Sequence, residues 1–193
     1  MNTWGLSKDF ILASASHRRL ELLKDAGFIP LKVVSADIDE TIKEGEKPCA
    51  YVARVAKEKA MYVASLHQGI CVVSADTIVL AGGKIIRKAK NEQEARQNLE
   101  FLSGKTQYAI TGYCVVSDEG EVLVRTIKTK IILKKFAPKE VEALLNSGEW
   151  KDAAAYKIQG IMSALVKKVK GSYTNIVGLP VFEISEDLKR ILK

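Results

Sequence analysis

The sequence has few of the residues that build metal centres and disulfide frameworks. Its 193 residues include three cysteines and two histidines. Cys49, Cys71 and Cys114 form no C-x-x-C pair, so the sequence excludes a disulfide framework, a zinc site and a histidine-rich metal centre. The apolar run Phe10 to Ala13 is too short for a signal-peptide core, and no run reaches the length of a membrane span. We therefore expect a cytoplasmic protein with reduced thiols.

Low-complexity segments and internal repeats are also missing, and the composition is that of a globular protein, 47% hydrophobic and 27% charged. A chain of this length forms one large domain or two small lobes. The net charge of +7 favours anionic partners such as nucleotides, nucleic acid or a membrane surface. One basic stretch alternates along an apparent strand from Thr126 to Lys135, which is typical of a solvated strand face. The two densest groups of lysines are Lys128, Lys130, Lys134 and Lys135, and Lys167, Lys168 and Lys170.

The stretch from Cys71 to Leu80 predicts a buried strand, yet it carries a carboxylate in its middle. Apolar residues, many of them branched, flank Asp76 on both sides, which fits a strand covered on both faces. An unpaired buried charge is strongly unfavourable. Two interpretations follow. Asp76 either caps a turn between two strands and faces water, or it lines a cleft, where it binds a metal or takes a proton.

A strand–turn–helix unit opens the chain. Phe10 to Ser14 predicts a strand, and a helix follows from about His17 to Ala26, closed by Gly27. Arg18 and Arg19 lie in the first turn of this helix, where backbone amides and the helix dipole favour anions. The pattern indicates either an anion site or a serine cap followed by two solvent-facing arginines.

An acidic patch follows the second predicted strand, which runs from Pro30 to Ser35. Its members are Asp37, Asp39 and Glu40. In a basic protein such a patch either holds a divalent cation or forms an ordinary polar loop. Both interpretations stay open at this point.

The helix predicted from Pro48 to about Leu66 carries a lysine on its apolar stripe. Lys59 follows Val55 by one turn and precedes Val63 by one turn. Such a lysine either extends to the edge of the core or projects into a cleft. We favour the cleft, because neighbouring charged residues already cover the polar side of the helix.

The rest of the chain predicts further strands and helices. The region from Glu149 to Pro180 is less regular, and its glycines suggest tight turns that bring the backbone close to another group. The other expected elements are a strand at Lys84 to Arg87, a helix from Asn91 to Leu102, strands at Gln107 to Ser117 and Val122 to Leu133, a short helix from Pro138, and a helix from Val181 to Leu192.

Several segments, taken in order, resemble the motifs of the Maf nucleotide pyrophosphatases. Each motif is weak alone, but together they keep the family's order and span almost the whole chain. They are Leu12 to Leu23, Glu58 to Ala60, Ser74 to Val79, Leu102 to Lys105, Ile158 to Gly160, and Gly171 to Pro180.

The resemblance implies a fold and an activity. The implied fold is an α/β structure, a single Maf-like domain over residues 1–193, with an elongated mixed β-sheet, flanking helices and two lobes around a central cleft, similar to inosine triphosphate pyrophosphatase. The implied activity is a house-cleaning hydrolysis in nucleotide metabolism. In that reaction a nucleoside triphosphate yields the monophosphate and pyrophosphate, with a divalent metal cation (Mg²⁺ or Mn²⁺) as cofactor.

The resemblance also implies roles for individual residues. Asp76 corresponds to the general base, and Glu40 stands with it near the metal. Arg18, Thr77 and Gln159 fall where the family sets its base preference, and they look like members that prefer dTTP and UTP, although modified pyrimidines also fit. The implied substrate-binding residues are Ser14, Arg18, Arg19, Lys59, Thr77, Lys88 and Gln159.

The chain departs from the family pattern in places. Gln107 replaces a usual histidine, and the run Glu149 to Tyr156 is one residue shorter and lacks the usual lysine and glycine. This departure keeps an alternative open, a nucleotide-binding regulator of cell division or septum formation with little turnover. No aromatic-interleaved basic motif indicates nucleic-acid recognition, so we expect no stable nucleic-acid complex and no membrane association. A homodimer is compatible with the sequence.

Overall fold

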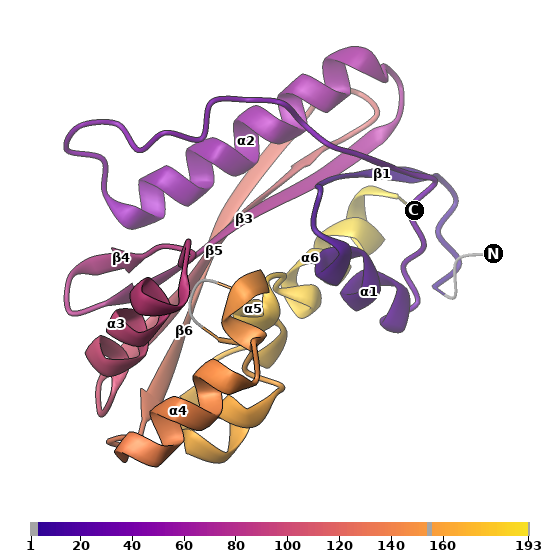
Figure 1. The fold of residues 1–193 in the computed structure, drawn as a ribbon. Coiled ribbons are helices and arrows are strands. Elements are labelled where there is room, and N and C mark those ends of the chain that lie inside the picture. The colour runs from indigo at the N-terminus through magenta and orange to yellow at the C-terminus, as the bar shows by residue number, and fades with distance from the viewer. Residues whose placement is uncertain (1–3, 154–155, 193) are drawn as a thin grey trace. The chain divides into compact units, whose positions relative to one another are not determined.

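The computed structural model describes residues 4–153 and 156–192. Helices and strands alternate along the chain (Figure 1). Seven strands form one mixed sheet in the order β2-β1-β3-β5-β6-β7, and β4 pairs with β3 outside this path. β1 pairs in parallel with β2 and β3, whereas β4 and β7 pair antiparallel to their neighbours. A mixed sheet flanked by helices confirms the predicted fold class.

The element bounds agree with the predicted ones within two residues. The strands are β1 (Phe10–Ala13), β2 (Lys32–Val34), β3 (Cys71–Ala81), β4 (Lys84–Ile86), β5 (Thr106–Val116), β6 (Val122–Leu133) and β7 (Val166–Lys170). The helices are α1 (His17–Asp25), α2 (Pro48–Leu66), α3 (Glu92–Leu102), α4 (Pro138–Asn146), α5 (Tyr173–Val177) and α6 (Val181–Ile191), with 3-10 turns η1 (Glu149–Asp152) and η2 (Ile161–Leu165). Within the described residues, no helix is both long and apolar enough to cross a membrane.

The chain divides into two compact units. Unit 1 comprises Met1–Thr77, Thr111–Ile127 and Gly178–Lys193, and unit 2 comprises Ile78–Ile110 and Lys128–Val177. Strands β3, β5 and β6 contribute residues to both units. The two units agree with the expectation of two lobes, and the cleft between them stays a prediction.

In unit 1 the side chains of β1 alternate between two apolar clusters. Phe10 and Leu12 pack with residues of α1 and α6. Ile11 and Ala13 pack with the apolar stripe of α2. The period of two in a strand accounts for this division, so the sheet of unit 1 carries α2 on one face and α1 with α6 on the other.

A glycine lets α2 lie directly on β5. A Cβ atom at Gly112 would lie 2.3 Å from the carbonyl oxygen of Val52, which no side chain tolerates. The close approach of helix and strand therefore requires glycine at this position. It fixes α2, and with it Lys59, against the sheet.

The core of unit 2 packs α3 and α4 on its part of the sheet. Leu99 of α3 and Leu144 of α4 share one cluster with Ile131 and Leu133 of β6. The sequence did not predict β7, which lies in the region expected to be irregular. Its five residues alternate poorly between apolar and lysine side chains, so the strand becomes evident only through its antiparallel pairing with β6.

Candidate active site

Strand β3 presents two neighbouring residues to opposite faces of the sheet. Ser74 and Asp76 share the face of α2, and the Ser74 hydroxyl donates to the carbonyl of Ala56 in that helix. Thr77 lies on the other face, where it meets Arg19 of α1. The strand runs unbroken through Asp76, which is buried. The interpretation of Asp76 as a water-facing turn residue is therefore wrong.

Asp76 belongs to a charged cluster in unit 1. The Nζ atom of Lys59 lies 3.3 Å from Oδ1 of Asp76 and 2.8 Å from Oε1 of Glu40. Lys59 and Asp76 are 9% and 8% exposed, whereas the Glu40 side chain is 47% exposed. Buried charges persist only when they are paired, so the three side chains stabilise one another. The cluster also has an open side at Glu40.

The loop before α2 brings Glu40 to this cluster. The Tyr51 hydroxyl donates to the backbone carbonyl of Glu40 over 3.0 Å, and Arg54 Nη2 donates to the carbonyl of Thr41 over 2.9 Å. Arg54 also forms an ion pair with Glu46, 2.6 Å from Nε to Oε1. Helix α2 thus holds the loop at three points. The side chain of Asp39 instead accepts the Thr41 amide, which lowers the pKa of Asp39.

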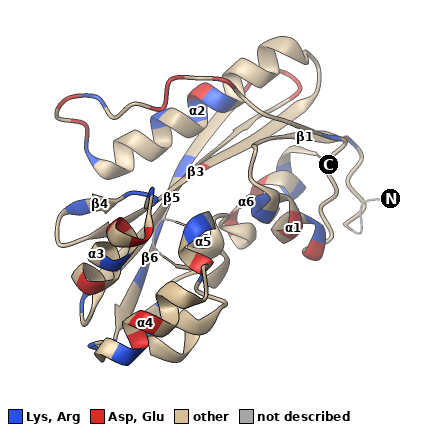
Figure 2. Ribbon diagram, in the orientation of Figure 1, with Lys and Arg blue, Asp and Glu red and all other residues tan. Residues whose placement is uncertain are grey.

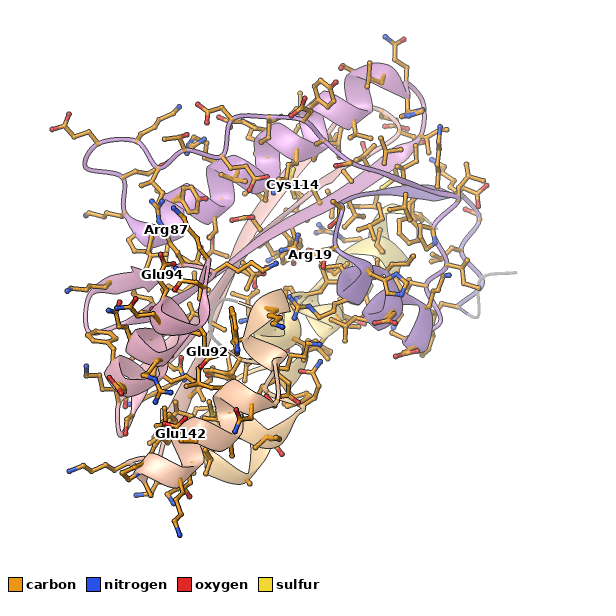
Figure 3. The ribbon with its side chains drawn as sticks, viewed as in Figure 1. Arg19, Arg87, Glu92, Glu94, Cys114 and Glu142 are labelled. Atoms are coloured by element: carbon orange, nitrogen blue, oxygen red, sulfur yellow. The ribbon has the colours of Figure 1, made fainter. Side chains whose placement is uncertain are left out.

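On the other face of β3, Arg19 makes three hydrogen bonds. Its Nε donates to the carbonyl of Gly178 over 2.9 Å, Nη2 donates to Thr77 Oγ1 over 3.3 Å, and Nη1 lies 3.4 Å from Ser14 Oγ (Figure 3). Burial lowers the pKa of Arg19, and the nearby carboxylates Asp76 and Glu40 oppose that shift. Arginine still stays protonated. The guanidinium is thus held in one orientation.

Proton counting assigns directions within this network. Thr77 Oγ1 lies 3.2 Å from the Gly178 carbonyl and 2.8 Å from Thr111 Oγ1. A hydroxyl has one proton and two lone pairs. When Thr77 donates to Gly178, it accepts from both Arg19 and Thr111. Thr111 is fully buried in β5 and is then the donor that completes the coordination of Thr77.

Arg18 differs from its neighbour. It is partly exposed, and within the described part of the chain its guanidinium makes no hydrogen bond or ion pair. Ser14 accepts the backbone amide of Ser16 over 3.1 Å, so it shapes the turn that leads into α1. The first turn of α1 therefore offers one arginine that is held in place and one that is available to an anion.

The cluster also bears on metal binding. Within the described residues, no group of three or more His, Cys, Asp or Glu side chains is arranged to hold a metal ion. Asp76 and Glu40 nevertheless place oxygens within 3.3 Å of one ammonium group. Magnesium commonly takes one or two carboxylates and completes its coordination with water and substrate phosphates. Two convergent carboxylates fit such a shared site and not an all-protein cage.

Two of the expected substrate residues lie in unit 2. Lys88 is exposed just after β4, where it lines an open pocket of about 550 Å³ with Arg87, Glu94 and Phe101 among others. Gln159 is exposed in the turn before η2. The structure therefore leaves both side chains accessible to a ligand. Their approach to the Asp76 cluster stays a prediction.

The turn of Gln159 is braced by a carboxylate of the same unit. Oε2 of Glu149 accepts the backbone amide of Ile161 over 3.2 Å. A Cβ atom at Gly160 would lie 2.0 Å from Oε1 of Glu149. The sequence predicted that this glycine brings the backbone close to a ligand. The group that it approaches here is the Glu149 side chain, which fixes the turn.

The segment that departs from the family pattern is partly ordered by packing. Trp150 is buried, and its indole donates to the carbonyl of Leu145 over 3.1 Å. Ala154 and Ala155 lie outside the described residues. The Tyr156 hydroxyl accepts a hydrogen bond from the buried amide of Gln107, and burial raises the pKa of Tyr156. Gln107 thus takes a hydrogen-bonding position where the family usually has a histidine.

The sequence gave no signal for Thr111 or for the carbonyl of Gly178. Both enter the site only through the register of β3 with β5 and the path of the chain before α6. A threonine in a buried strand looks ordinary, because the strand pattern indicates burial and says nothing about hydroxyl partners. The contact between Thr77 and Thr111 is the observation that reveals their role.

Comparisons with known proteins extend over nearly the whole chain. The chain is similar to a dTTP/UTP pyrophosphatase of Paramagnetospirillum magneticum, with 42% identity over 91% of this chain and 93% of that protein. It is also similar to a nucleoside triphosphate pyrophosphatase of Anaplasma phagocytophilum, with 40% identity over 90% of each chain. Among solved structures, the Staphylococcus aureus Ham1 protein matches with 11% identity and a TM-score of 0.47, over 93% of this chain and 100% of that one.

A family model described as Maf-like protein matches residues 9–191. That range contains the Lys59–Asp76–Glu40 cluster and the Arg19 network, as well as Lys88 and Gln159. The match agrees with the order of motifs along the sequence. The chain therefore belongs to the Maf-like protein family.

Proposed function

We propose that this chain hydrolyses nucleoside triphosphates to the monophosphate and pyrophosphate. The observation that carries the proposal is the buried aspartate of β3, Asp76, paired with Lys59 beside the half-exposed carboxylate of Glu40. Relatives at 40–42% identity that are named as pyrophosphatases support it. The cluster combines a base, a cation and an open side, which hydrolysis of a polyanion requires.

The reaction follows from these groups. Water attacks the α-phosphorus, a bond forms between the water oxygen and that phosphorus, and the bond to the pyrophosphate oxygen breaks. Asp76 takes the proton of the attacking water. Because the triphosphate is strongly anionic, positioning and charge neutralisation supply most of the rate enhancement. Lys59 and Arg18 provide that positive charge, while Arg19 holds the strand and helix that carry these groups in register.

A divalent cation belongs to the same proposal. Asp76 and Glu40 would hold Mg²⁺ or Mn²⁺, since their oxygens converge on one point in unit 1. The ion, when bound, neutralises phosphate charge and lowers the pKa of a bound water. Removal of the metal with a chelator should then abolish pyrophosphate release without unfolding the protein.

The substrate base is the finer part of the proposal. We infer a preference for dTTP and UTP or related modified pyrimidines, because relatives carry that name and Gln159 offers both a donor and an acceptor. Thr77 contributes indirectly, since its hydroxyl is engaged by Gly178, Arg19 and Thr111. Gln159→Ala should change the ratio of kcat/KM for UTP against purine triphosphates. An equal fall for every triphosphate would assign Gln159 to the turn or the phosphates.

A cytoplasmic location also belongs to the proposal. Cys71 and Cys114 are buried free thiols, and burial raises the pKa of each to about 12. Such thiols are unreactive, as expected in a reducing compartment. A homodimer stays a prediction.

One screen tests the activity. Pyrophosphate release is measured for canonical and modified nucleoside triphosphates, with Mg²⁺, with Mn²⁺ and with a chelator. We expect metal-dependent release that is fastest for a pyrimidine triphosphate. Tight nucleotide binding without release would instead favour the alternative, a regulator with little turnover.

A further inference from the structure

Strands β6 and β7 bring two groups of lysines together in unit 2. Their antiparallel register sets Lys130 opposite Lys170 and Ile132 opposite Lys168. Because residues two apart on a strand share a face, Lys128 lies on the same face as Lys130. Four lysines thus form one surface, here called the lysine face: Lys128, Lys130, Lys168 and Lys170. Figure 2 marks the lysine positions along β6 in blue.

The lysine face is the side of β6 and β7 turned away from the core of unit 2. The residues between the lysines of β6, Thr129 and Ile131, are fully buried, and Ile131 packs in the cluster that contains α3 and α4. Lys128, Lys168 and Lys170 are exposed, and Lys130 is partly exposed. These ammonium groups are therefore presented to solvent by a rigid strand pair.

Nothing acidic offsets this charge nearby. None of the three adjacent strands β5, β6 and β7 contains an Asp or a Glu. Within residues 4–153 and 156–192, none of the four lysines has a carboxylate partner within 4.0 Å. Lysines elsewhere are paired, as Lys134 is with Glu140 at 2.6 Å. Lys128 instead lies 3.9 Å from the ring centroid of Tyr108.

The arrangement is unfavourable for the isolated protein. Like charges directly opposite each other on neighbouring strands destabilise a sheet, and Lys130 and Lys170 are such a pair. The repulsion disappears when a polyanion lies across both strands. The lysines of one strand repeat every two residues, about 6.5 Å apart, which suits a polymer with evenly spaced single charges.

We propose that the lysine face binds the phosphate backbone of a single-stranded nucleic acid. An open sheet face suits a single strand, whereas duplex recognition needs an element that enters a groove. An acidic membrane fits less well, because β7 and the part of β6 in unit 2 expose no large apolar side chain for insertion. The surface lies outside the Asp76 cluster, so the proposal is independent of the hydrolytic activity.

The proposed binding is weak and independent of base sequence. Four phosphate contacts predict a slope of about −3 for log K against log salt, since each contact on a single strand contributes about −0.7. Contacts of this kind give dissociation constants of roughly 10⁻⁴–10⁻⁶ M at physiological salt. The sequence-based expectation of no stable complex therefore stands, and the inference adds a transient one. The sequence could not show it, because only strand pairing unites the two lysine groups.

Fluorescence anisotropy with a labelled oligo-dT tests the proposal. Wild type is compared with Lys130→Gln/Lys170→Gln over a series of salt concentrations. The control, Lys90→Gln/Lys139→Gln, removes the same charge from exposed positions of unit 2 outside β6 and β7. We expect the first variant to bind about tenfold more weakly at low salt and to lose about 1.4 from the salt slope, while the control binds like wild type.

Two further measurements separate this outcome from its rivals. The melting temperature of Lys130→Gln/Lys170→Gln should be unchanged or higher, since a repulsive pair is removed. The proposal is overturned if wild type shows no binding at low salt, or if the control loses as much affinity. It is also overturned if polyglutamate or anionic lipid vesicles bind the lysine face more tightly than the oligonucleotide at equal charge concentration.

Discussion

Asp76 and Thr77 are consecutive residues of β3 with surroundings of opposite character. Asp76 faces full charges, Lys59 and through it Glu40. Thr77 faces the Thr111 hydroxyl, the Gly178 carbonyl and a guanidinium that is already held by other partners. A set of paired charges can exchange partners when a charged ligand arrives. A satisfied network of hydrogen bonds instead holds its members in place. We therefore assign chemistry to the Asp76 face and orientation to the Thr77 face.

The largest expected effect comes from removing the base. Asp76→Asn keeps the shape of the side chain but removes its charge and its ability to take a proton. We expect kcat for pyrophosphate release to fall by about 10²-fold or more, the range of a general base. Circular dichroism should show an intact fold. Near-normal turnover in this variant would show that the Asp76 face does not carry the chemistry.

Periodicity explains how much of this comparison the sequence could predict. The apolar stripe of α2 placed Lys59 on the buried side, and the branched residues around Asp76 indicated its burial. Those patterns describe a residue's own element. They carry no information about pairing between β3 and β5, so Thr111 was not found. For the same reason β7 was missed, and so was the close approach of α2 to Gly112.

A second expected effect separates charge balance from catalysis on the Asp76 face. Lys59→Met removes the cation and leaves the buried Asp76 without its partner. We expect a fall of roughly 2–3 kcal/mol in the free energy of unfolding, since breaking a largely buried pair leaves an uncompensated charge. The double variant Lys59→Met/Asp76→Asn should recover most of that stability but no activity. Urea denaturation measures the first quantity, and pyrophosphate release measures the second.

Additive losses of stability in these two variants would contradict the assignment. Additivity is expected of residues that do not interact, whereas contacting residues show a coupling free energy in a double-mutant cycle. In that case Lys59 would act as a packing residue of α2, and the charged cluster would not be the unit that the structure describes.

The Thr77 face should respond more weakly and in a different parameter. Thr111→Val is nearly isosteric but removes the proton that Thr77 accepts. Arg19 then loses part of its support, and we expect KM to rise severalfold with kcat little changed. Stability should fall by about 1 kcal/mol, as for one buried hydrogen bond. Thr111→Ser keeps the hydroxyl and is the matched control. Equal KM values for the Val and Ser variants would show that the hydroxyl has no orienting role.

The smallest expected effect concerns the loop that carries Glu40 to the Asp76 face. The Arg54 guanidinium lowers the pKa of Glu46 to about 2. A carboxyl whose pKa is depressed on folding adds stability above its unfolded value near 4.5 and loses that contribution as the pH falls toward 2. Glu46→Gln should therefore lower the melting temperature by a small amount at neutral pH. The difference from wild type should shrink below about pH 4.5 and vanish near pH 2. A difference that stays constant over this range would mean that the Glu46 charge does not stabilise the loop through Arg54.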